Sequence, residues 1–225
     1  FPIAGSMRPS IMGRHGMVTS GHSLASLAGE RILARGGNAI DAGVAAGLCL
    51  TVLHSDMIDL AGVAPMMIYS AAEDRVITLS GLGRWPKAAT VEYFQKHCDG
   101  KNPQGVLRCL SPGAPDAWIT ALERFGTMSL ADVLEDAIPL AEEGFPMHPF
   151  MAANLQSGAD RMRQWPSSAE IFLPGGTVPE PGAIFVQKDL GRTMRRLRDA
   201  EARARYHSRA AGLRAARDEF YRGDL

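Results

Sequence analysis

The feature that most restricts how this sequence can fold is a short block at residues 36–42, which reads Gly-Gly-Asn-Ala-Ile-Asp-Ala. It follows residues 23–35, where apolar side chains recur at the spacing of one helix face. Paired glycines favour a helix end because glycine adopts the left-handed conformation needed there. Asn38 is a good N-cap for a following helix, with Asp41 near the positive end of its dipole. The block therefore predicts a junction of two helices, with positive φ at one of the glycines.

The second predicted helix, residues 39–53, carries Ala, Gly, Val, Leu and Cys on nearly every side. A helix that is apolar all round is buried, and its small residues let neighbouring backbones approach closely. We therefore expect Val44, Leu48 and Val52 to be inaccessible to solvent. The segment is too short and its side chains too small to favour a membrane span.

The rest of the chain contains few strands and many helices, so the sequence predicts an α+β or layered α/β class. Residues 1–16 are expected to form an extended N-terminal arm, and residues 17–20 a short strand. Two further strands, 66–69 and 75–79, are separated by a turn and predict a hairpin. Helices are predicted at 91–98, 115–125, 129–143, 149–164 and 200–221, and residues 185–199 are expected to begin extended and become helical.

Composition excludes several classes of protein. The 225 residues are 46% hydrophobic and 21% charged, as in ordinary globular domains. Lys plus Arg and Asp plus Glu both number 24, so no net field attracts nucleic acid or an acidic membrane. The three cysteines indicate neither a disulfide framework nor a CxxC metal site, and Cys49 is expected in the core. No signal peptide is visible, so we expect a cytoplasmic location, or a periplasmic one if a signal has been removed.

Five motifs in order resemble one family. The block at 36–42 is followed by one motif that consists of Ser-Pro-Gly-Ala-Pro at 111–115 and a helix that ends in Arg-Phe-Gly-Thr at 124–127. The sequence Ala-Ile-Pro-Leu-Ala-Glu-Glu-Gly-Phe-Pro comes at 137–146, then Ile-Phe-Leu-Pro at 171–174 and Glu-Phe-Tyr-Arg-Gly at 219–223. Together they resemble the large subunit of γ-glutamyltranspeptidases, which are N-terminal-nucleophile (Ntn) hydrolases. The resemblance covers residues 17–225.

The resemblance implies a four-layer αββα sandwich, in which residues 17–225 form the large-subunit portion and a second, small subunit completes the sheets. It implies self-cleavage of a precursor that frees an N-terminal Thr, whose hydroxyl attacks an amide carbonyl while its α-amine acts as base. Residue 1 is Phe, and no Thr-Thr-His-like cleavage sequence occurs up to Leu225. We therefore expect no catalytic residue in this chain, no cofactor or metal, and a nucleophile on the partner. A dimer of such heterodimers is left open.

One substrate-binding residue of the family falls within this chain. Typical members read Asp-Gly-Arg-Glu-x-Ala-Pro after the second strand, and their Arg grips the α-carboxylate of the glutamyl substrate bidentately. Here residues 80–86 read Ser-Gly-Leu-Gly-Arg-Trp-Pro. Counting back from Pro86 places Leu82 at the family's Arg position, with Gly83 beside it and Arg84 two residues later. The candidate substrate-binding residues are therefore Leu82, Gly83 and Arg84, and standard γ-glutamyl specificity is in question.

A second departure lies at residues 56–65, where typical members carry a run of glycines and this chain has one. Fewer glycines permit less close backbone approach, so this loop is expected to pack differently.

Other polar groups have two interpretations each. His54, Asp56 and Asp59 could bind a metal or form an acid–base group, but helix-end polar groups are more common. Arg84 could bind substrate, or it could stack on Trp85 or pair at the surface. Nine arginines between residues 192 and 217 indicate a solvated helix face rather than a nucleic-acid patch. The other histidines (His15, His22, His97, His148 and His207) are scattered along the sequence and predict no triad.

The sequence thus favours an Ntn amidohydrolase that cleaves a small amide other than a standard γ-glutamyl compound. Two alternatives remain. One is a true γ-glutamyltransferase or glutathione hydrolase that binds glutamate through Arg84. The other is a non-catalytic scaffold that keeps the fold without the chemistry.

Overall fold

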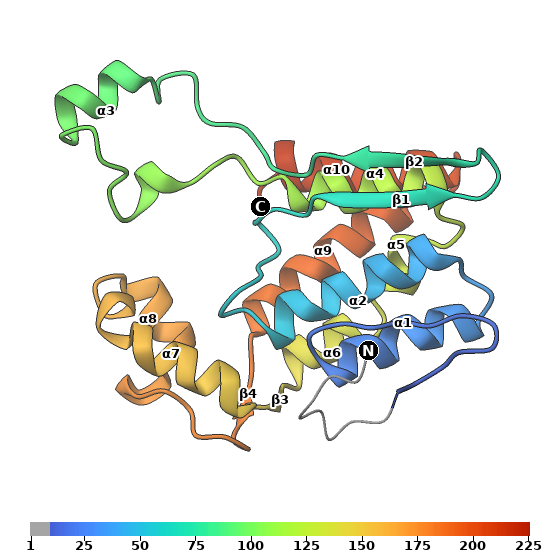
Figure 1. Ribbon diagram of the computed structural model, residues 1–225, viewed down its shortest axis with the longest axis horizontal. Helices are drawn as coiled ribbons and strands as arrows, with labels where there is room; N and C mark the ends of the chain where they lie inside the picture. Colours follow the sequence, from blue (N-terminus) through green and yellow to red (C-terminus); the bar gives the residue numbers. More distant parts are fainter. Residues whose placement is uncertain (1–9) are drawn as a thin grey trace.

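The computed structural model describes residues 10–225 and places one helix, α2 (Ala39–Leu53), at the centre of the molecule. Helix α1 (Ser23–Ala34) lies along one side of it, and α4 (Ala114–Phe125), α5 (Leu130–Val133) and α6 (Ala137–Glu142) contact it on others. Helices α9 (Lys188–Ala204) and α10 (Arg209–Arg222) pack against each other and against α6 and α4 respectively (Figure 1).

The junction of α1 and α2 has the predicted form. Gly36 has a φ of +89°, its N–H donates to the Leu33 carbonyl, and the Gly37 N–H donates to the Ile32 carbonyl. These two bonds form a Schellman motif, which satisfies carbonyls that the helix end would otherwise leave free. Asn38 and Asp41 then form a capping box at the start of α2. Both the helix junction and the positive φ are confirmed.

Burial of α2 is also confirmed. The side chains of Val44, Leu48 and Val52 are all buried in the main core, together with Cys49. Burial raises the pKa of the Cys49 thiol to about 12, so this cysteine is an inert core residue.

Asp41 joins α2 to the segment that follows α4. Its carboxylate is fully buried and accepts hydrogen bonds from the backbone N–H of Asn38, Thr127 and Met128 and from the Thr127 hydroxyl. A Cβ at Gly126 would lie 2.5 Å from an Asp41 oxygen. A buried carboxylate is stable when hydrogen bonds replace its hydration, and here four donors do so.

The prediction of a single helix at 129–143 is wrong. Ser129 caps it as expected, but the structure divides it into α5 and α6, separated by a turn at residues 134–136. Pro139 explains the break, because proline has no N–H to donate to the Glu135 carbonyl and its ring crowds that oxygen. Glu201 on α9 caps α5 by accepting from the Leu130 and Ala131 N–H groups at 2.8 and 2.9 Å.

The strands form two separate two-stranded antiparallel sheets among residues 10–225. One is the predicted hairpin of β1 (Met66–Ser70) and β2 (Arg75–Leu79), which is drawn in front of α4 and α10 in the view of Figure 1. The other pairs β3 (Phe145–Pro146) with β4 (Ile184–Phe185). The predicted α+β class is confirmed. Residues 17–20 form no strand, because none of the described residues pairs with them.

The remaining helices lie at the periphery. Helices α7 (Pro149–Met162) and α8 (Pro166–Phe172) form one lobe, followed by the 3₁₀ turn Pro174–Gly176. Helix α3 (Val91–His97) buries no residue and projects from the body with the 3₁₀ turn Val106–Arg108 (Figure 1). The helix predicted at 200–221 is divided, since α9 runs to Ala204 and Ser208 caps α10. Of the predicted arm, residues 1–9 lie outside the described part of the chain, and residues 10–16 are exposed.

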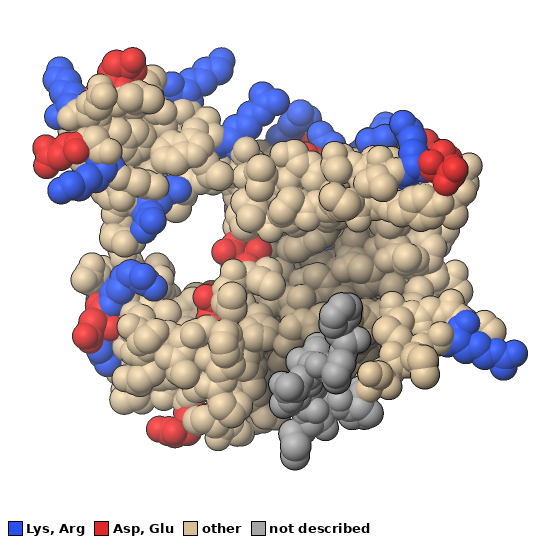
Figure 2. All heavy atoms as spheres, in the orientation of Figure 1, with Lys and Arg blue, Asp and Glu red and all other residues tan. Residues whose placement is uncertain are grey.

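Charged side chains gather at the edges of the face seen in Figure 2, while the middle of that face is largely uncharged. Seven of the nine arginines between residues 192 and 217 form ion pairs within the chain, which supports the solvated-face interpretation. None of the helices between residues 10 and 225 is both long and apolar enough to cross a bilayer.

Candidate functional site

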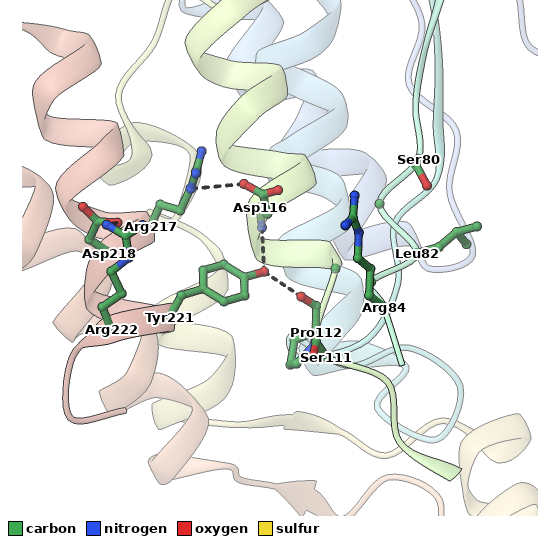
Figure 3. A pocket seen from close by; sticks show the side chains of 13 residues that line it. Ser80, Leu82, Arg84, Ser111, Pro112, Asp116, Arg217, Asp218, Tyr221 and Arg222 are labelled. Atoms are coloured by element: carbon green, nitrogen blue, oxygen red, sulfur yellow. Dashed lines mark hydrogen bonds and ion pairs between the residues drawn. The ribbon is translucent and has the colours of Figure 1, made fainter. Parts of the chain in front are cut away.

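A hollow of about 530 Å³ lies where the chain leaves the hairpin. Residues 80–84 form one wall, residues 111–113 and the first turn of α4 form the floor, and the end of α10 forms the opposite wall (Figure 3). All three predicted substrate-binding residues, Leu82, Gly83 and Arg84, line it. Their role in binding a substrate stays a prediction.

Glycine is required where the loops that form the hollow cross. Gly83 has a φ of +74°, and a Cβ there would lie 1.8 Å from the Ser111 carbonyl oxygen. A Cβ at Gly113 would lie 2.4 Å from both the Gly81 oxygen and the Gly83 nitrogen. No side chain fits at such distances, so glycines allow the two backbones to touch.

Backbone hydrogen bonds hold this crossing together. The Ala64 N–H donates to the Gly81 carbonyl at 2.9 Å, and the Gly113 and Ala114 N–H groups both donate to the Gly62 carbonyl. Gly62 is the one glycine in the stretch 56–65, where the family carries a run. This loop therefore supports the site through its backbone, although its side chains do not line the hollow.

Leu82 and Arg84 point in different directions. In Figure 3 the Leu82 side chain extends away from α4, whereas the Arg84 guanidinium rises beside the first turn of α4, on the side of Asp116. Among residues 10–225 the Arg84 side chain forms no ion pair or hydrogen bond and does not stack on Trp85, whose ring packs against Phe94 instead. Neither surface pairing nor stacking on Trp85 is found for Arg84 among the described residues, and its role stays a prediction.

The α10 wall carries charges that are already paired. Arg217 bonds Asp116 at 3.2 Å, and Arg222 bonds Asp218 at 3.3 Å. Between them the Tyr221 hydroxyl donates to the Pro112 carbonyl at 2.7 Å and accepts from the Asp116 N–H at 3.2 Å. Burial raises the pKa of this phenol, so it stays protonated and able to donate at neutral pH. Sequence reasoning missed Tyr221, although it lies within the motif at 219–223.

A second group of polar residues lines a different hollow and shares no residue with the first. His22 and His148 were expected to be scattered, and His54 was grouped with Asp56 and Asp59, yet the three rings meet. The centroids are 4.5 Å apart for His54 and His148 and 5.3 Å apart for His22 and His148. His22 caps α1 and His148 caps α7, each by accepting a backbone N–H at Nδ1, while His54 ends α2. We call these three residues the histidine junction.

The histidine junction is structural. His148 Nε2 donates to the Leu53 carbonyl and His54 Nε2 to the Gly21 carbonyl, so each ring joins two segments. The buried Asp56 lies 3.4 Å from His54 Nδ1 and accepts from Asn154, while Asp59 is exposed. No group of three or more potential ligands within residues 10–225 could hold a metal ion. His54 lies at the end of α2, as the helix-end interpretation expected, and an acid–base role with Asp56 stays a prediction.

Comparison with known proteins identifies the family. The family model described as gamma-glutamyltranspeptidase matches residues 25–225. The chain belongs to the γ-glutamyltranspeptidase family. It is 34% identical over 97% of its length to the glutathione hydrolase-like YwrD proenzyme of Bacillus subtilis, of which it covers 39%. It is 37% identical over 81% of its length to the acylase ACY 1 proenzyme of a Pseudomonas species, of which it covers 34%.

The fold of this γ-glutamyltranspeptidase-family chain also matches a solved structure. The γ-glutamyltranspeptidase of Helicobacter pylori superposes with a TM-score of 0.80 at 30% identity, over 95% of this chain and 62% of that one. The likeness confirms the predicted Ntn-hydrolase fold class. The chain spans less than two fifths of the length of the two curated relatives named above.

Proposed function

We propose that this chain is the large-subunit portion of a self-processing N-terminal-threonine amidohydrolase that cleaves a small amide other than a standard γ-glutamyl compound. Family membership supports an amide-bond hydrolase or acyltransferase, and the similar proteins are named proenzymes, consistent with cleavage into two subunits. The proposed substrate class rests on Leu82, which lines the hollow and occupies the position where the family pattern has its carboxylate-binding Arg.

The hairpin supports a partner subunit. Met67, Tyr69 and Val76 are largely exposed on β1 and β2, and among residues 10–225 each of these strands is paired with another strand on one side only. Exposed apolar side chains on unpaired strand edges favour pairing with further strands. In the proposed enzyme the small subunit supplies those strands and brings its N-terminal Thr to the hollow.

The chemistry then follows from the nucleophile. The Thr hydroxyl attacks the amide carbonyl and its own α-amine accepts the proton. That proton passes to the amide nitrogen as the C–N bond breaks, so that the amine product leaves and the acyl-enzyme ester forms. Water or an amine attacks that ester next and restores the free Thr. In this proposal the wall at residues 82–84 of this chain orients the acyl group. Holding the reacting groups in the right geometry raises the rate.

A true γ-glutamyltransferase or glutathione hydrolase is the second candidate, and one observation favours it. The Arg84 guanidinium lies beside the hollow without a carboxylate partner among residues 10–225, so it is available to a substrate anion. Because it lies two residues beyond the family's Arg position, a glutamyl carboxylate would have to bind differently. The non-catalytic scaffold is the third candidate.

Self-processing separates the enzyme from the scaffold. The complete gene product is expressed and its chains are sized by mass spectrometry, with the N-terminus of the smaller chain sequenced. We expect two chains and a smaller one that begins with Thr, and replacement of that Thr by Ala should leave one uncut, inactive chain. A wild-type protein that stays as one chain and hydrolyses no amide would favour the scaffold.

Three anilides then test the substrate class. γ-Glutamyl anilide carries both the α-carboxylate and the α-amine, glutaryl anilide lacks the amine, and butyryl anilide lacks both. We expect kcat/KM for the γ-glutamyl compound to be at least about tenfold below the best of the others, as for a lost charge-assisted hydrogen bond. A clear preference for the γ-glutamyl compound would overturn this half of the proposal.

A further inference from the structure

Tyr221 is tied to the substrate-facing loop although it lies more than a hundred residues away along the chain. Its hydroxyl, near the end of α10, makes two hydrogen bonds to the start of α4: it donates to the Pro112 carbonyl and accepts from the Asp116 N–H (Figure 3). The phenol therefore connects the last helix of the described chain to the floor of the hollow.

Helix α4 needs this contact because it lacks a cap of its own. Its N-cap residue is Gly113, which has no side chain to accept the free N–H groups of the first turn. Any larger residue at 113 would collide with the backbone of Gly81 and Gly83. The close approach of the loop thus excludes an ordinary cap, and the Tyr221 hydroxyl takes that role at Asp116.

The same contact reaches Arg84 through the backbone. Ser111, next to Pro112, donates its N–H to the Arg84 carbonyl at 2.9 Å. Gly83 lies against the Ser111 carbonyl, so residues 82–84 rest directly on the segment that Tyr221 holds. A shift of Pro112 would therefore move the loop that carries Leu82 and Arg84.

We propose that Tyr221 is a positioning residue that sets the geometry of the loop at residues 82–84 and thereby the affinity for the acyl group of the substrate. It forms no bond to substrate and acts through Pro112, Ser111 and the Arg84 backbone. The inference rests on the proposed function of that loop, whereas the contact itself is a property of this chain.

The test compares Tyr221→Phe with Tyr206→Phe in the complete, self-cleaved protein. Tyr206 is a matched control because it is exposed, packs on His207 and lines no part of the hollow. For butyryl and glutaryl anilides we expect Tyr221→Phe to raise KM about 3- to 10-fold with kcat changed less than about twofold, as for the loss of hydrogen bonds that fix a binding wall. Tyr206→Phe should change neither constant.

Hydrogen exchange gives a second readout that does not depend on activity. In Tyr221→Phe the backbone amides of Ser111 and Asp116 should exchange faster, while those of α2 keep their wild-type rates. A variant with unchanged exchange at Ser111, or one that loses thermal stability while KM stays at the wild-type value, would overturn the proposal. If the wild-type protein turns over neither anilide, the proposed function fails and the exchange rates alone decide whether Tyr221 holds the loop.

Discussion

The surroundings of α2 and the surroundings of the hollow are built on opposite principles. Around α2, side chains of α1, α4, α5 and α6 close a core, and the buried carboxylate of Asp41 has its hydrogen bonds within the chain. Around the hollow, backbone meets backbone at Gly83 and Gly113, and the side chains of Leu82 and Arg84 on the same loop are exposed. The comparison contrasts a core that side chains of this chain close with a loop crossing that leaves Leu82 and Arg84 open to solvent.

The largest effect is expected at the centre of the scaffold. Asp41→Ala removes the acceptor for backbone donors of Asn38, Thr127 and Met128 and leaves them buried without partners. We expect a loss of roughly 3–5 kcal/mol in the free energy of unfolding, measured by urea titration. Asp59→Ala is the control, because Asp59 is exposed, and it should change stability by less than about 0.5 kcal/mol. A loss below about 1 kcal/mol for Asp41→Ala would mean that the junction is not the anchor of the fold.

A smaller effect on stability is expected at the loop crossing, with a larger effect on activity. Gly83→Ala places a Cβ against the Ser111 carbonyl at a positive φ, so the loop must move. We expect a cost of roughly 1–3 kcal/mol and a rise in KM for the best anilide. Gly43→Ala is the matched control, since Gly43 lies on α2 with open space around it, and should stabilise by roughly 0.5–1 kcal/mol. Equal KM values for Gly83→Ala and wild type would show that this loop does not affect substrate binding.

The sequence predicted the surroundings of α2 well and the hollow only in outline. The α1–α2 junction follows from local rules, because Gly36, Asn38 and Asp41 act on residues within one or two turns. The hollow depends on contacts between segments far apart in the sequence, such as Gly83 with Ser111 and Tyr221 with Asp116, which no periodicity encodes. The family motif at 219–223 contained Tyr221, but only the structure shows what its hydroxyl bonds.

The histidine junction and the break before α6 show the same limit. His22, His54 and His148 are unrelated by spacing, and they meet only because the starts of α1 and α7 lie against the end of α2. The break between α5 and α6 was visible in the sequence as Pro139, yet the strong cap at Ser129 favoured one long helix. Here the proline's missing donor outweighs the cap and the apolar pattern.

The smallest effect on stability is expected at the histidine junction, and it depends on pH. Burial, followed by the neighbouring His148 and His54, lowers the pKa of His22 below its ordinary value of 6.5. His22 therefore binds a proton more readily in the unfolded chain than in the folded one. The free energy of unfolding falls as the pH drops below about 6.5, and it stops falling once the pH is below the pKa of His22 in the folded chain. Protonation at Nδ1 would also remove the acceptor that caps α1.

This pH dependence can be tested with a variant that keeps the cap. His22→Asn retains a good N-cap acceptor but cannot titrate. We expect the difference in Tm between about pH 7.5 and about pH 5.5 to be smaller in His22→Asn than in wild type. His207→Asn, a change at an exposed histidine outside the junction, is the control and should keep the wild-type difference. If the Tm difference in His22→Asn equals that of the wild type, a group other than His22 causes the acid sensitivity.

The most direct test of the central claim, that the wall at residues 82–84 sets the substrate class, is the rate with γ-glutamyl anilide. The complete, self-cleaved wild type is compared with Leu82→Arg and Arg84→Ala. We predict weak wild-type turnover, because Leu82 has no guanidinium to bind the glutamyl carboxylate. Leu82→Arg should raise kcat/KM by about 10- to 150-fold, and Arg84→Ala should change it little. Efficient wild-type turnover that collapses in Arg84→Ala would contradict this and identify a γ-glutamyl enzyme that binds its substrate through Arg84.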